Sequence, residues 1–329
     1  MAKTAVLVTG GAGYIGSHTC KALALAGYNP IAYDNLWTGH RELVRWGDFV
    51  HGDILDTARL AETMRKYAIQ GVIHFAARSD VGESVTKPEE YYHTNISGTL
   101  SLLNAMRAQN VRFIVVSSSC AVYGTPKTVP IAEDCPRHPV NPYGFTKLAM
   151  ERMLDEFETP FGITSAALRY FNAAGADAEG ETGEWHDPET HLIPRVFMAA
   201  NSLAPELHIF GDDYDTSDGT CVRDYIHVAD LATAHVKALA HLEKGGESIK
   251  LNLGTGRGYS VKELVATAET ILGRAVPHSI HGRRAGDAPT LVADASKAKE
   301  VLGWQAEQSG LEHILRTAAA FADVLRRRP

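Results

Sequence analysis

Short apolar runs alternate with amphipathic stretches along the first half of the chain, and each pattern predicts a different element. Buried strands are predicted at residues 4–8, 30–33, 49–53, 71–77 and 112–117, with helices between them at 14–26, 57–66 and 88–109. Strands that alternate with helices pair in parallel and are covered on both faces. The pattern therefore predicts an α/β fold with a doubly wound parallel sheet of the Rossmann type.

The pattern loosens after a sixth strand, predicted at residues 163–169. Later elements are spaced more widely, with polar loops at 175–190 and 209–220, a strand at 251–254 and helices at 228–244 and 260–272. We expect residues 1–170 to form the domain that contains this sheet, to which the chain returns near 221–253. Residues 171–329 would then form mainly a smaller C-terminal α/β domain that binds substrate above the strand ends.

Composition narrows the class of protein. The chain has 329 residues and a net charge of −7, which gives no electrostatic basis for binding nucleic acid. No apolar run approaches the roughly 20 residues of a membrane span, and the first predicted strand lies too close to Met1 for a signal peptide. The four cysteines show no metal-ligand spacing. We expect a cytoplasmic protein that has no metal ion and binds neither nucleic acid nor membrane.

A glycine-rich segment joins the first predicted strand to the first predicted helix. Gly10, Gly13 and Gly16 have the spacing G-x-x-G-x-x-G. Glycines at such a turn let backbone N–H groups approach a pyrophosphate, which the positive end of the helix also attracts. Because the segment lies between a strand and a helix, it predicts a dinucleotide site.

Asp34 follows the second predicted strand, about 20 residues beyond the glycines. A carboxylate at this place accepts hydrogen bonds from an adenosine ribose and repels a 2′-phosphate. An ordinary turn aspartate would look the same in the sequence. Together with the glycine segment, Asp34 predicts that the cofactor is NAD rather than NADP.

Three residues with acid–base chemistry are predicted to meet at the same edge of the sheet. Ser119 follows the fifth strand, and Asn141 and Pro142 start a helix on which Tyr143 and Lys147 share one face. If that helix packs beside the strand, Ser119, Tyr143 and Lys147 can move a proton to or from an alcohol. A solvated surface pair has the same Tyr–Lys spacing, so the assignment depends on the rest of the chain.

These motifs follow one another in a fixed order along the whole chain. They include the glycine segment, Asp34, Ser119 and the Tyr143–Lys147 pair, and further matches lie at 168–172, 218–227 and 283–287. The chain thereby resembles the extended short-chain dehydrogenase/reductases, and within them it is most similar to the UDP-glucose 4-epimerases. The resemblance implies a homodimer that uses NAD to interconvert UDP-galactose and UDP-glucose by transient oxidation at C4 of the sugar.

The resemblance also implies roles for individual residues. Tyr143 matches the base, Lys147 the lysine that lowers its pKa, and Ser119 the hydroxyl that contacts the sugar 4-oxygen. Beside these three, cofactor contacts are expected at Gly10, Gly13, Tyr14, Ile15, Gly16, Asp34, Asn35, Asp53, Ile54, Phe75, Ala76, Ala77, Asn95, Tyr170 and Phe171. Beside Ser119 and Tyr143, contacts to the UDP-sugar are expected at Asn172, His191, Leu192, Phe210, Arg223, Arg284, Asp287 and Leu291.

Several positions depart from the family pattern. Ser79 stands where many members have a lysine near the cofactor phosphates, and Arg78 next to it is a candidate replacement. His191 stands where some members have asparagine. Cys120 and Ala121 lack the carboxylates that the related 4,6-dehydratases and decarboxylases place there. The alternatives are a UDP-uronic acid 4-epimerase, which needs an extra cation, and a catalytically silent NAD-binding regulator.

The expected role of Lys147 can be tested against the size of the effect it needs. A free phenol has a pKa near ~10, and lowering it by about three units requires roughly 4 kcal/mol. A positive charge about 4 Å away supplies ~1 kcal/mol in water and ~4 kcal/mol at an effective dielectric near 20. Lys147 is therefore sufficient to activate Tyr143 only in a partly closed site, where the positive nicotinamide helps.

Overall fold

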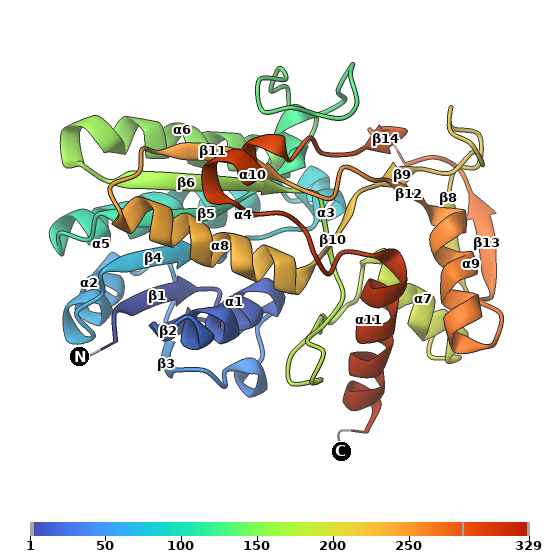
Figure 1. The fold of residues 1–329 in the computed structure, drawn as a ribbon, viewed down its shortest axis with the longest axis horizontal. Coiled ribbons are helices and arrows are strands. Elements are labelled where there is room, and N and C mark those ends of the chain that lie inside the picture. Colours follow the sequence, from blue (N-terminus) through green and yellow to red (C-terminus); the bar gives the residue numbers. More distant parts are fainter. Residues whose placement is uncertain (1–2, 285, 328–329) are drawn as a thin grey trace.

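The computed structural model describes residues 3–284 and 286–327, and its centre is a seven-stranded parallel sheet (Figure 1). The strand order is β11-β6-β5-β4-β1-β2-β3. These strands are β1 (Ala5–Thr9), β2 (Asn29–Asp34), β3 (Asp48–His51), β4 (Gly71–His74), β5 (Phe113–Ser119), β6 (Thr164–Tyr170) and β11 (Ile249–Leu253). Every pairing in the sheet is parallel. The predicted doubly wound parallel sheet is confirmed.

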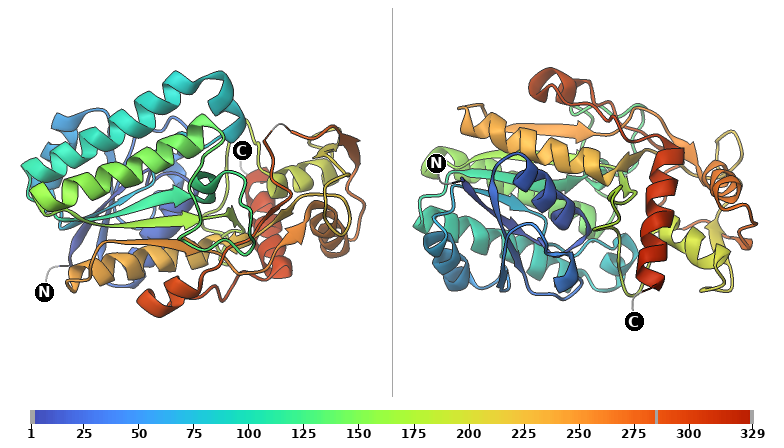
Figure 2. Two further views of the ribbon diagram at one scale, coloured as in Figure 1. Left: turned by 90° about the horizontal axis from the view of Figure 1, so that it is seen from above. Right: turned by 60° about the horizontal axis from the view of Figure 1, so that its bottom comes forward.

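Helices cover both faces of the sheet (Figure 2). One face is covered by α1 (Tyr14–Leu25) and α8 (Val228–Glu243), the other by α2 (Thr57–Lys66), α5 (Gly98–Ala108) and α6 (Pro142–Phe161). Side chains along a strand point alternately to the two faces. Leu7 of β1 accordingly belongs to the core under α2, α5 and α6, whereas Val6 and Val8 belong to the core under α1 and α8.

Local chemistry explains where the key helices begin and end. The Asn141 side chain accepts a hydrogen bond from Gly144 N at 2.8 Å, and Pro142 occupies the first turn of α6. Gly162 ends α6 with a φ of +62°, a conformation that favours glycine. Ser260 accepts a hydrogen bond from Glu263 N at the start of α9 (Val261–Leu272), the helix predicted at 260–272.

The helix predicted at 88–109 is not one regular helix. It is divided into α4 (Pro88–Tyr91), a π-helical turn η2 (Tyr92–Ser97) and α5. The wider turn surrounds Asn95, which is fully buried and hydrogen-bonded to Thr146 of α6 at 2.9 Å. Single π-helical turns inside α-helices are frequent at functional sites. The hydrophobic pattern alone could not distinguish this turn from an α-helix.

A smaller lobe lies beyond the carboxyl ends of the strands, on the right in Figure 1. Its strands are short: β7 (Asn172–Ala174), β8 (Leu207–Phe210), β9 (Val222–Arg223), β10 (Tyr225–His227), β12 (Tyr259–Ser260), β13 (His278–His281) and β14 (Thr290–Leu291). Its helices are α7 (Leu192–Ala200), α9 and α11 (Leu311–Arg326), which share one apolar core with β8. The remaining elements are α3 (Val81–Thr86), α10 (Ser296–Leu302), η1 (Arg41–Leu43) and η3 (Cys120–Tyr123).

The chain enters the large sheet a second time after passing through the smaller lobe. Helix α8 packs against α1, and β11 pairs in parallel with β6, where Leu251 lies opposite Leu168. Trp304, which follows α10, is buried in the same core and donates a hydrogen bond from Nε1 to the Asp230 carbonyl at 3.0 Å. Within the described residues, no helix is both long enough and apolar enough to cross a membrane.

A buried ion pair fastens α6 to the sheet. Arg169 of β6 and Glu151 of α6 are 1% and 2% exposed, and two parallel hydrogen bonds of 2.8 and 2.6 Å join them. Ser118 of β5 donates to the same carboxylate at 2.6 Å. Arg169 also donates to the hydroxyl of Tyr123, which in turn donates to Asn252 of β11. The network therefore ties α6 to three neighbouring strands.

We expect Glu151→Gln to lower the free energy of unfolding by about 3–5 kcal/mol, because it leaves the buried Arg169 guanidinium without its counter-charge. Urea denaturation followed by circular dichroism measures this change. Glu156→Gln is the matched control, because Glu156 on the same helix pairs with Arg152 at an exposed position and should matter little. Equal stability of the two variants would contradict a locking role for the buried pair.

Candidate active site

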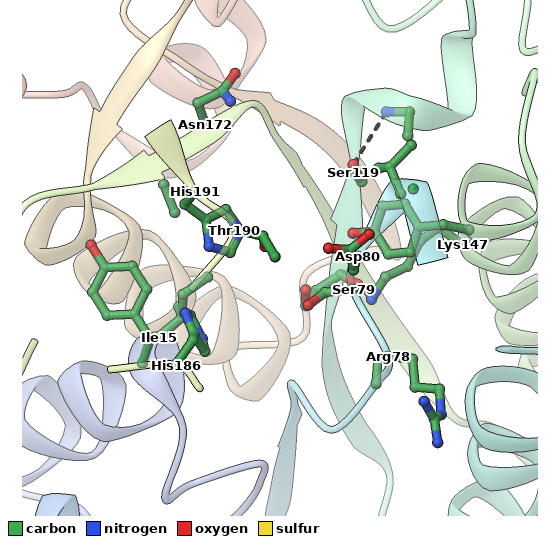
Figure 3. Close-up of a pocket in the computed structure, with 18 of the residues that line it drawn as sticks. Ile15, Arg78, Ser79, Asp80, Ser119, Lys147, Asn172, His186, Thr190 and His191 are labelled. Carbon is green, nitrogen blue, oxygen red and sulfur yellow. Dashed lines mark hydrogen bonds between the residues drawn. The ribbon is translucent and has the colours of Figure 1, made fainter. Parts of the chain in front are cut away.

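A cavity of about 1250 Å³ lies at the carboxyl ends of the strands and is lined by both the large sheet and the smaller lobe. Sites for one small molecule usually measure roughly 300–1,000 Å³, so this cavity has room for more than one ligand. Every site residue predicted from the sequence lines it, with the exception of Asn95. Figure 3 shows Ser119 and Lys147 on one wall and Asn172 and His191 on another.

At two positions the glycine segment turns too tightly for any other residue. Gly10 has a φ of +73°, and a Cβ there would lie 2.7 Å from the backbone nitrogen of Ala76. A Cβ on Gly16 would lie 2.0 Å from the Gly10 carbonyl oxygen. Gly13 provides no side-chain cap for α1, so the N-terminus of this helix faces the cavity without one. Such a cradle fits the pyrophosphate of a dinucleotide.

Asp34 lies at the end of β2, where the adenosine end of a dinucleotide would bind. Its carboxylate accepts hydrogen bonds from Ala12 N at 3.0 Å and Leu36 N at 2.8 Å, which fix its orientation. Burial raises the pKa of Asp34, and the two N–H donors act against that shift. Asn35 and Asp53 lie beside it and are hydrogen-bonded to each other at 2.8 Å.

Ser119, Tyr143 and Lys147 meet in the cavity because α6 packs beside β5. Ser119 is the last residue of β5, and Tyr143 and Lys147 lie one turn apart on α6. Lys147 is only 2% exposed, and its Nζ donates a hydrogen bond to the Ser117 carbonyl at 2.8 Å. The same Nζ lies 5.8 Å from the centre of the Tyr143 ring. The Tyr143–Lys147 pair is therefore part of a cavity wall and is not a solvated surface pair.

Burial controls the protonation of this group. It raises the pKa of Tyr143 to about 12, although a hydrogen bond with the Ser119 hydroxyl acts in the opposite direction. Burial also lowers the pKa of Lys147 to about 7. Lys147 is thus only partly charged near neutral pH, and the Tyr143 phenol is protonated. Burial therefore outweighs the hydrogen bond with Ser119, and the protein alone does not make Tyr143 acidic.

Arg78 is engaged by protein groups at the rim of the cavity. Its guanidinium pairs with Glu83 at 3.3 Å and Glu90 at 2.5 Å, and it lies over the Trp37 ring at 3.9 Å. Its charge is therefore shared with two carboxylates. Asn95 holds the backbone of Arg78 through bonds of 2.8 Å and 3.1 Å and does not line the cavity.

Two arginines from separate segments, Arg223 of β9 and Arg284 in the loop before β14, line the part of the cavity formed by the smaller lobe. Arg223 donates to the Ala288 carbonyl at 2.8 Å, which fixes its guanidinium. Arg284 is exposed and lies over the Phe210 ring at 3.9 Å. Leu291 of β14 lies opposite Arg223 in the strand pairing and is half-buried. Two guanidinium groups that face one cavity are suited to a diphosphate, because each gives paired, charge-assisted hydrogen bonds.

The cavity is also lined by Glu184 and His186, which we did not predict from the sequence. They belong to a segment, residues 183–191, that contacts the start of α1. The Tyr14 hydroxyl donates to the Gly175 carbonyl at 2.5 Å, and its ring meets His186 edge-on with 6.5 Å between the ring centres. The only signal in the sequence is the spacing E-x-H-x-x-E-x-H, which ends at His191.

Comparison with known proteins agrees with this geometry. The curated UDP-glucose 4-epimerase of Rhizobium leguminosarum bv. trifolii is 52% identical over 318 residues, which is 97% of each protein. A crystal structure of UDP-glucose 4-epimerase from Brucella ovis in complex with NAD is 56% identical, with a TM-score of 0.95, and the match covers 97% of this chain and 98% of that one.

A further solved structure holds two ligands. It is UDP-glucose 4-epimerase from Bifidobacterium longum in complex with NAD+ and UDP, which is 41% identical with a TM-score of 0.93 and 98% coverage of both chains. The sequence model of the NAD dependent epimerase/dehydratase family matches residues 6–254, which is more than half of the chain. The chain belongs to the NAD dependent epimerase/dehydratase family.

Proposed function

We propose that this protein is an NAD-dependent isomerase that interconverts UDP-galactose and UDP-glucose by transient oxidation at C4 of the sugar. The observation that carries the proposal is that Ser119, Tyr143 and Lys147 share one cavity with the glycine segment and with two arginines. The cavity has room for more than one ligand, and relatives over the whole chain are UDP-glucose 4-epimerases.

The residues around the glycine segment fit NAD. Bound NAD supplies a hydride acceptor and a cationic nicotinamide ring. The backbone at Gly10 and Gly13 would receive the pyrophosphate, and the fixed carboxylate of Asp34 would receive the adenosine ribose. A 2′-phosphate would bring negative charge against the buried Asp34, so NAD is preferred over NADP.

Oxidation at C4 needs a group that takes the proton of the 4-hydroxyl. Tyr143 is that base in the proposal, and Ser119 orients the 4-oxygen by a hydrogen bond. Lys147 stabilises the phenolate in its charged form, which burial disfavours. A cationic ligand in the cavity lowers the pKa of Tyr143 but disfavours a second positive charge on Lys147. Tyr143 returns its proton when C4 is reduced again, so each residue ends the turnover in its starting state.

The smaller lobe would hold the UDP part of the substrate. Arg223 and Arg284 would bind the diphosphate. The nucleotide would be bordered by Asn172, His191, Leu192, Phe210 and Asp287. Holding the UDP firmly leaves the sugar free to turn, so that either face of C4 can point towards the cofactor. We propose that residues 1–170 form the cofactor-binding domain, to which the chain returns near 221–253, and that residues 171–329 bind mainly UDP-sugar.

We also propose that the protein is a cytoplasmic homodimer. The four cysteines are free, as expected in a reducing compartment. Tyr92 and Phe145 meet edge-on with 5.8 Å between their ring centres and are 39% and 47% exposed, and Leu100 on α5 is 43% exposed. Exposed apolar side chains on these neighbouring helices suit an interface with a second copy.

The test of the proposed function is turnover of UDP-galactose to UDP-glucose without added NAD, compared between the wild type and Tyr143→Phe. We expect the wild type to be active and the variant to be slower by at least about 10²-fold, as is typical when acid–base catalysis is lost. Tyr92→Phe is the control, because it removes a hydroxyl outside the cavity. Near wild-type turnover by Tyr143→Phe would refute the assignment of the base.

A second prediction concerns the choice of dinucleotide. Calorimetry should show that the wild type binds NAD more tightly than NADP. Asp34→Asn should shift the ratio of the two affinities towards NADP by about tenfold or more, equivalent to ~1.4 kcal/mol. Asp48→Asn is the charge-matched control, because Asp48 is exposed and lies at the start of β3, away from the strand end that carries Asp34. An unchanged ratio in Asp34→Asn would show that Asp34 does not select the cofactor.

A third prediction concerns the size of the sugar. In the family, a bulky aromatic at the position of Leu291 accompanies strict glucose and galactose use, and a small residue accompanies N-acetyl sugars. Leucine is intermediate, so we expect good turnover of UDP-galactose and weak turnover of UDP-N-acetylgalactosamine. Leu291→Ala should raise turnover of UDP-N-acetylgalactosamine relative to turnover of UDP-galactose. The gain should be up to ~1–3 kcal/mol, which is what a few methylenes of pocket space decide.

The measurement is the ratio of kcat/KM for the two sugars in each protein. Leu302→Ala is a suitable control for apolar truncation. Leu302 packs against the core between the sheet and helices α1 and α8, and it does not line the cavity. If Leu291→Ala leaves the ratio unchanged, Leu291 does not border the sugar.

A further inference from the structure

Three groups of histidine and acidic side chains, among the described residues, are close enough to hold a metal ion. Two of them already have other partners. The carboxylates of Asp177, Glu179 and Glu181 surround the Lys21 ammonium at 2.6–2.8 Å, which occupies the place of a cation.

The second group is Glu206, His208 and His281, and it is also satisfied by a neighbour. Ser279 donates to Glu206 at 2.6 Å and is hydrogen-bonded to His281 at 2.9 Å. Glu206 and His208 are both 41% exposed, so water reaches their polar atoms. Neither this group nor the one around Lys21 needs a metal ion to account for its geometry.

The third group, which we call the cavity cluster, consists of Glu184, His186, Glu189 and His191. The two imidazoles present Nδ1, and each Nδ1 lies between two carboxylates. His191 Nδ1 is 2.9 Å from Glu184 and 3.2 Å from Glu189, and His186 Nδ1 is 3.5 Å from Glu184 and 3.6 Å from Glu189. One possible ligand atom from each of the four side chains therefore lies within 4.8 Å of the other three.

Hydrogen bonds account for only part of this arrangement. His191 Nδ1 is hydrogen-bonded to Glu189 Oε1 at 3.2 Å, and that oxygen also accepts from the backbone N–H groups of Thr190 and His191 at 2.8 Å. An N–H donor lies about 2.7–3.2 Å from its oxygen acceptor, so both contacts of His186 are too long. Within the described part of the chain, His186 Nδ1 is buried and has no hydrogen-bond partner. Leaving a buried polar atom unpaired typically costs about 1–3 kcal/mol, so an unpaired nitrogen that faces two carboxylates needs an explanation.

Metal coordination accounts for the same distances. Zinc binds histidine nitrogen and carboxylate oxygen at about 2.0–2.2 Å. Four ligands in a tetrahedron around such an ion lie about 3.4 Å apart by that geometry, which lies within the 2.9–3.6 Å range of the nitrogen–oxygen distances in the cavity cluster. Mixed imidazole and carboxylate ligands suit divalent transition metals, whereas Mg²⁺ and Ca²⁺ prefer oxygen alone.

We propose that Glu184, His186, Glu189 and His191 bind one divalent transition-metal ion, such as Zn²⁺, on the wall of the cavity. Figure 3 shows His186 and His191 beside Ile15 and across the cavity from Lys147, so the ion has no part in proton transfer at Tyr143. From the cysteine spacing we expected no metal ion. The histidine and glutamate spacing lies in a loop, where no helix or strand periodicity marks it.

The ion would fasten the segment that carries His191 and Leu192. That segment is already anchored at Trp185, whose ring stacks on His40 at 3.6 Å between ring centres. Metal binding would also hold the part of the segment that lies next to Tyr14, at the start of α1. The consequence is a metal-dependent rigidity of the wall between the cofactor side and the substrate side of the cavity.

The test uses the full-length protein after treatment with EDTA. Co²⁺ is titrated in and followed by visible absorption, which reports coordination number, and Zn²⁺ is titrated by calorimetry. The titrations are run at pH 8.5, because protons compete for the imidazoles. We expect saturable binding of one ion per chain with the intense Co²⁺ absorption of four-coordinate sites, and no displacement by Mg²⁺.

His186→Ala and the nearly isosteric Glu189→Gln should each weaken metal binding by about tenfold or more, on the scale of lost metal-site interactions. The matched control is His281→Ala, which removes a histidine from the second group and should bind as the wild type does. Circular dichroism and melting in EDTA verify that each variant is folded. Absence of saturable binding in the wild type, or equal affinity in Glu189→Gln and His281→Ala, would overturn the proposal and leave an ion-pair cluster.

Discussion

The buried pair between Arg169 and Glu151 is the interaction on which the candidate active site depends. Ser119 comes from β5, whereas Tyr143 and Lys147 come from α6, so their relative positions depend on how this helix sits on the sheet. Apolar packing alone allows a helix to slide or rotate by small amounts. Two parallel hydrogen bonds to a fixed carboxylate do not, because guanidinium and carboxylate must stay in one plane.

The same burial creates a conflict within the site. Taking Lys147 out of water positions its ammonium group by a bond to the Ser117 carbonyl, but it also lowers the pKa of that group. Desolvation raises the pKa of Tyr143, so the phenol keeps its proton. The protein therefore provides rigid geometry and leaves the final charge balance to what binds. Under the proposed function, a cationic ligand supplies the charge that favours the phenolate of Tyr143.

The sequence predicted those features that arise from local chemistry or from strong periodicity. The parallel sheet, the glycine turn and the cap at Asn141 were correct because buried strands, steric limits and side-chain hydrogen bonds act over a few residues. The strands of the smaller lobe were mostly missed, since pairs such as β9 and β14 have only two residues each. Helix α7 was also missed, because it directly follows a polar loop.

Tertiary contacts decided the rest. Asn95 was expected at the cofactor, but its amide is used to hold the Arg78 backbone and Thr146 of α6. The pKa of Tyr143 likewise depends on burial that no sequence pattern reveals. The cavity cluster lies in a loop, where no periodicity marks its residues, and its side chains meet only after folding. Its spacing could therefore be recognised as a possible metal site only from the structure.

The late return of the chain to the sheet has a consequence for synthesis on the ribosome. Strand β6 is complete at Tyr170, but its partner β11 ends only at Leu253, so about 80 residues must be made in between. During that interval β6 has an open edge with unpaired N–H and C=O groups, which invites pairing with other chains. The core between α1 and the sheet also stays uncovered until α8 emerges. The nascent protein therefore passes through a long period in which chaperones have a surface to protect.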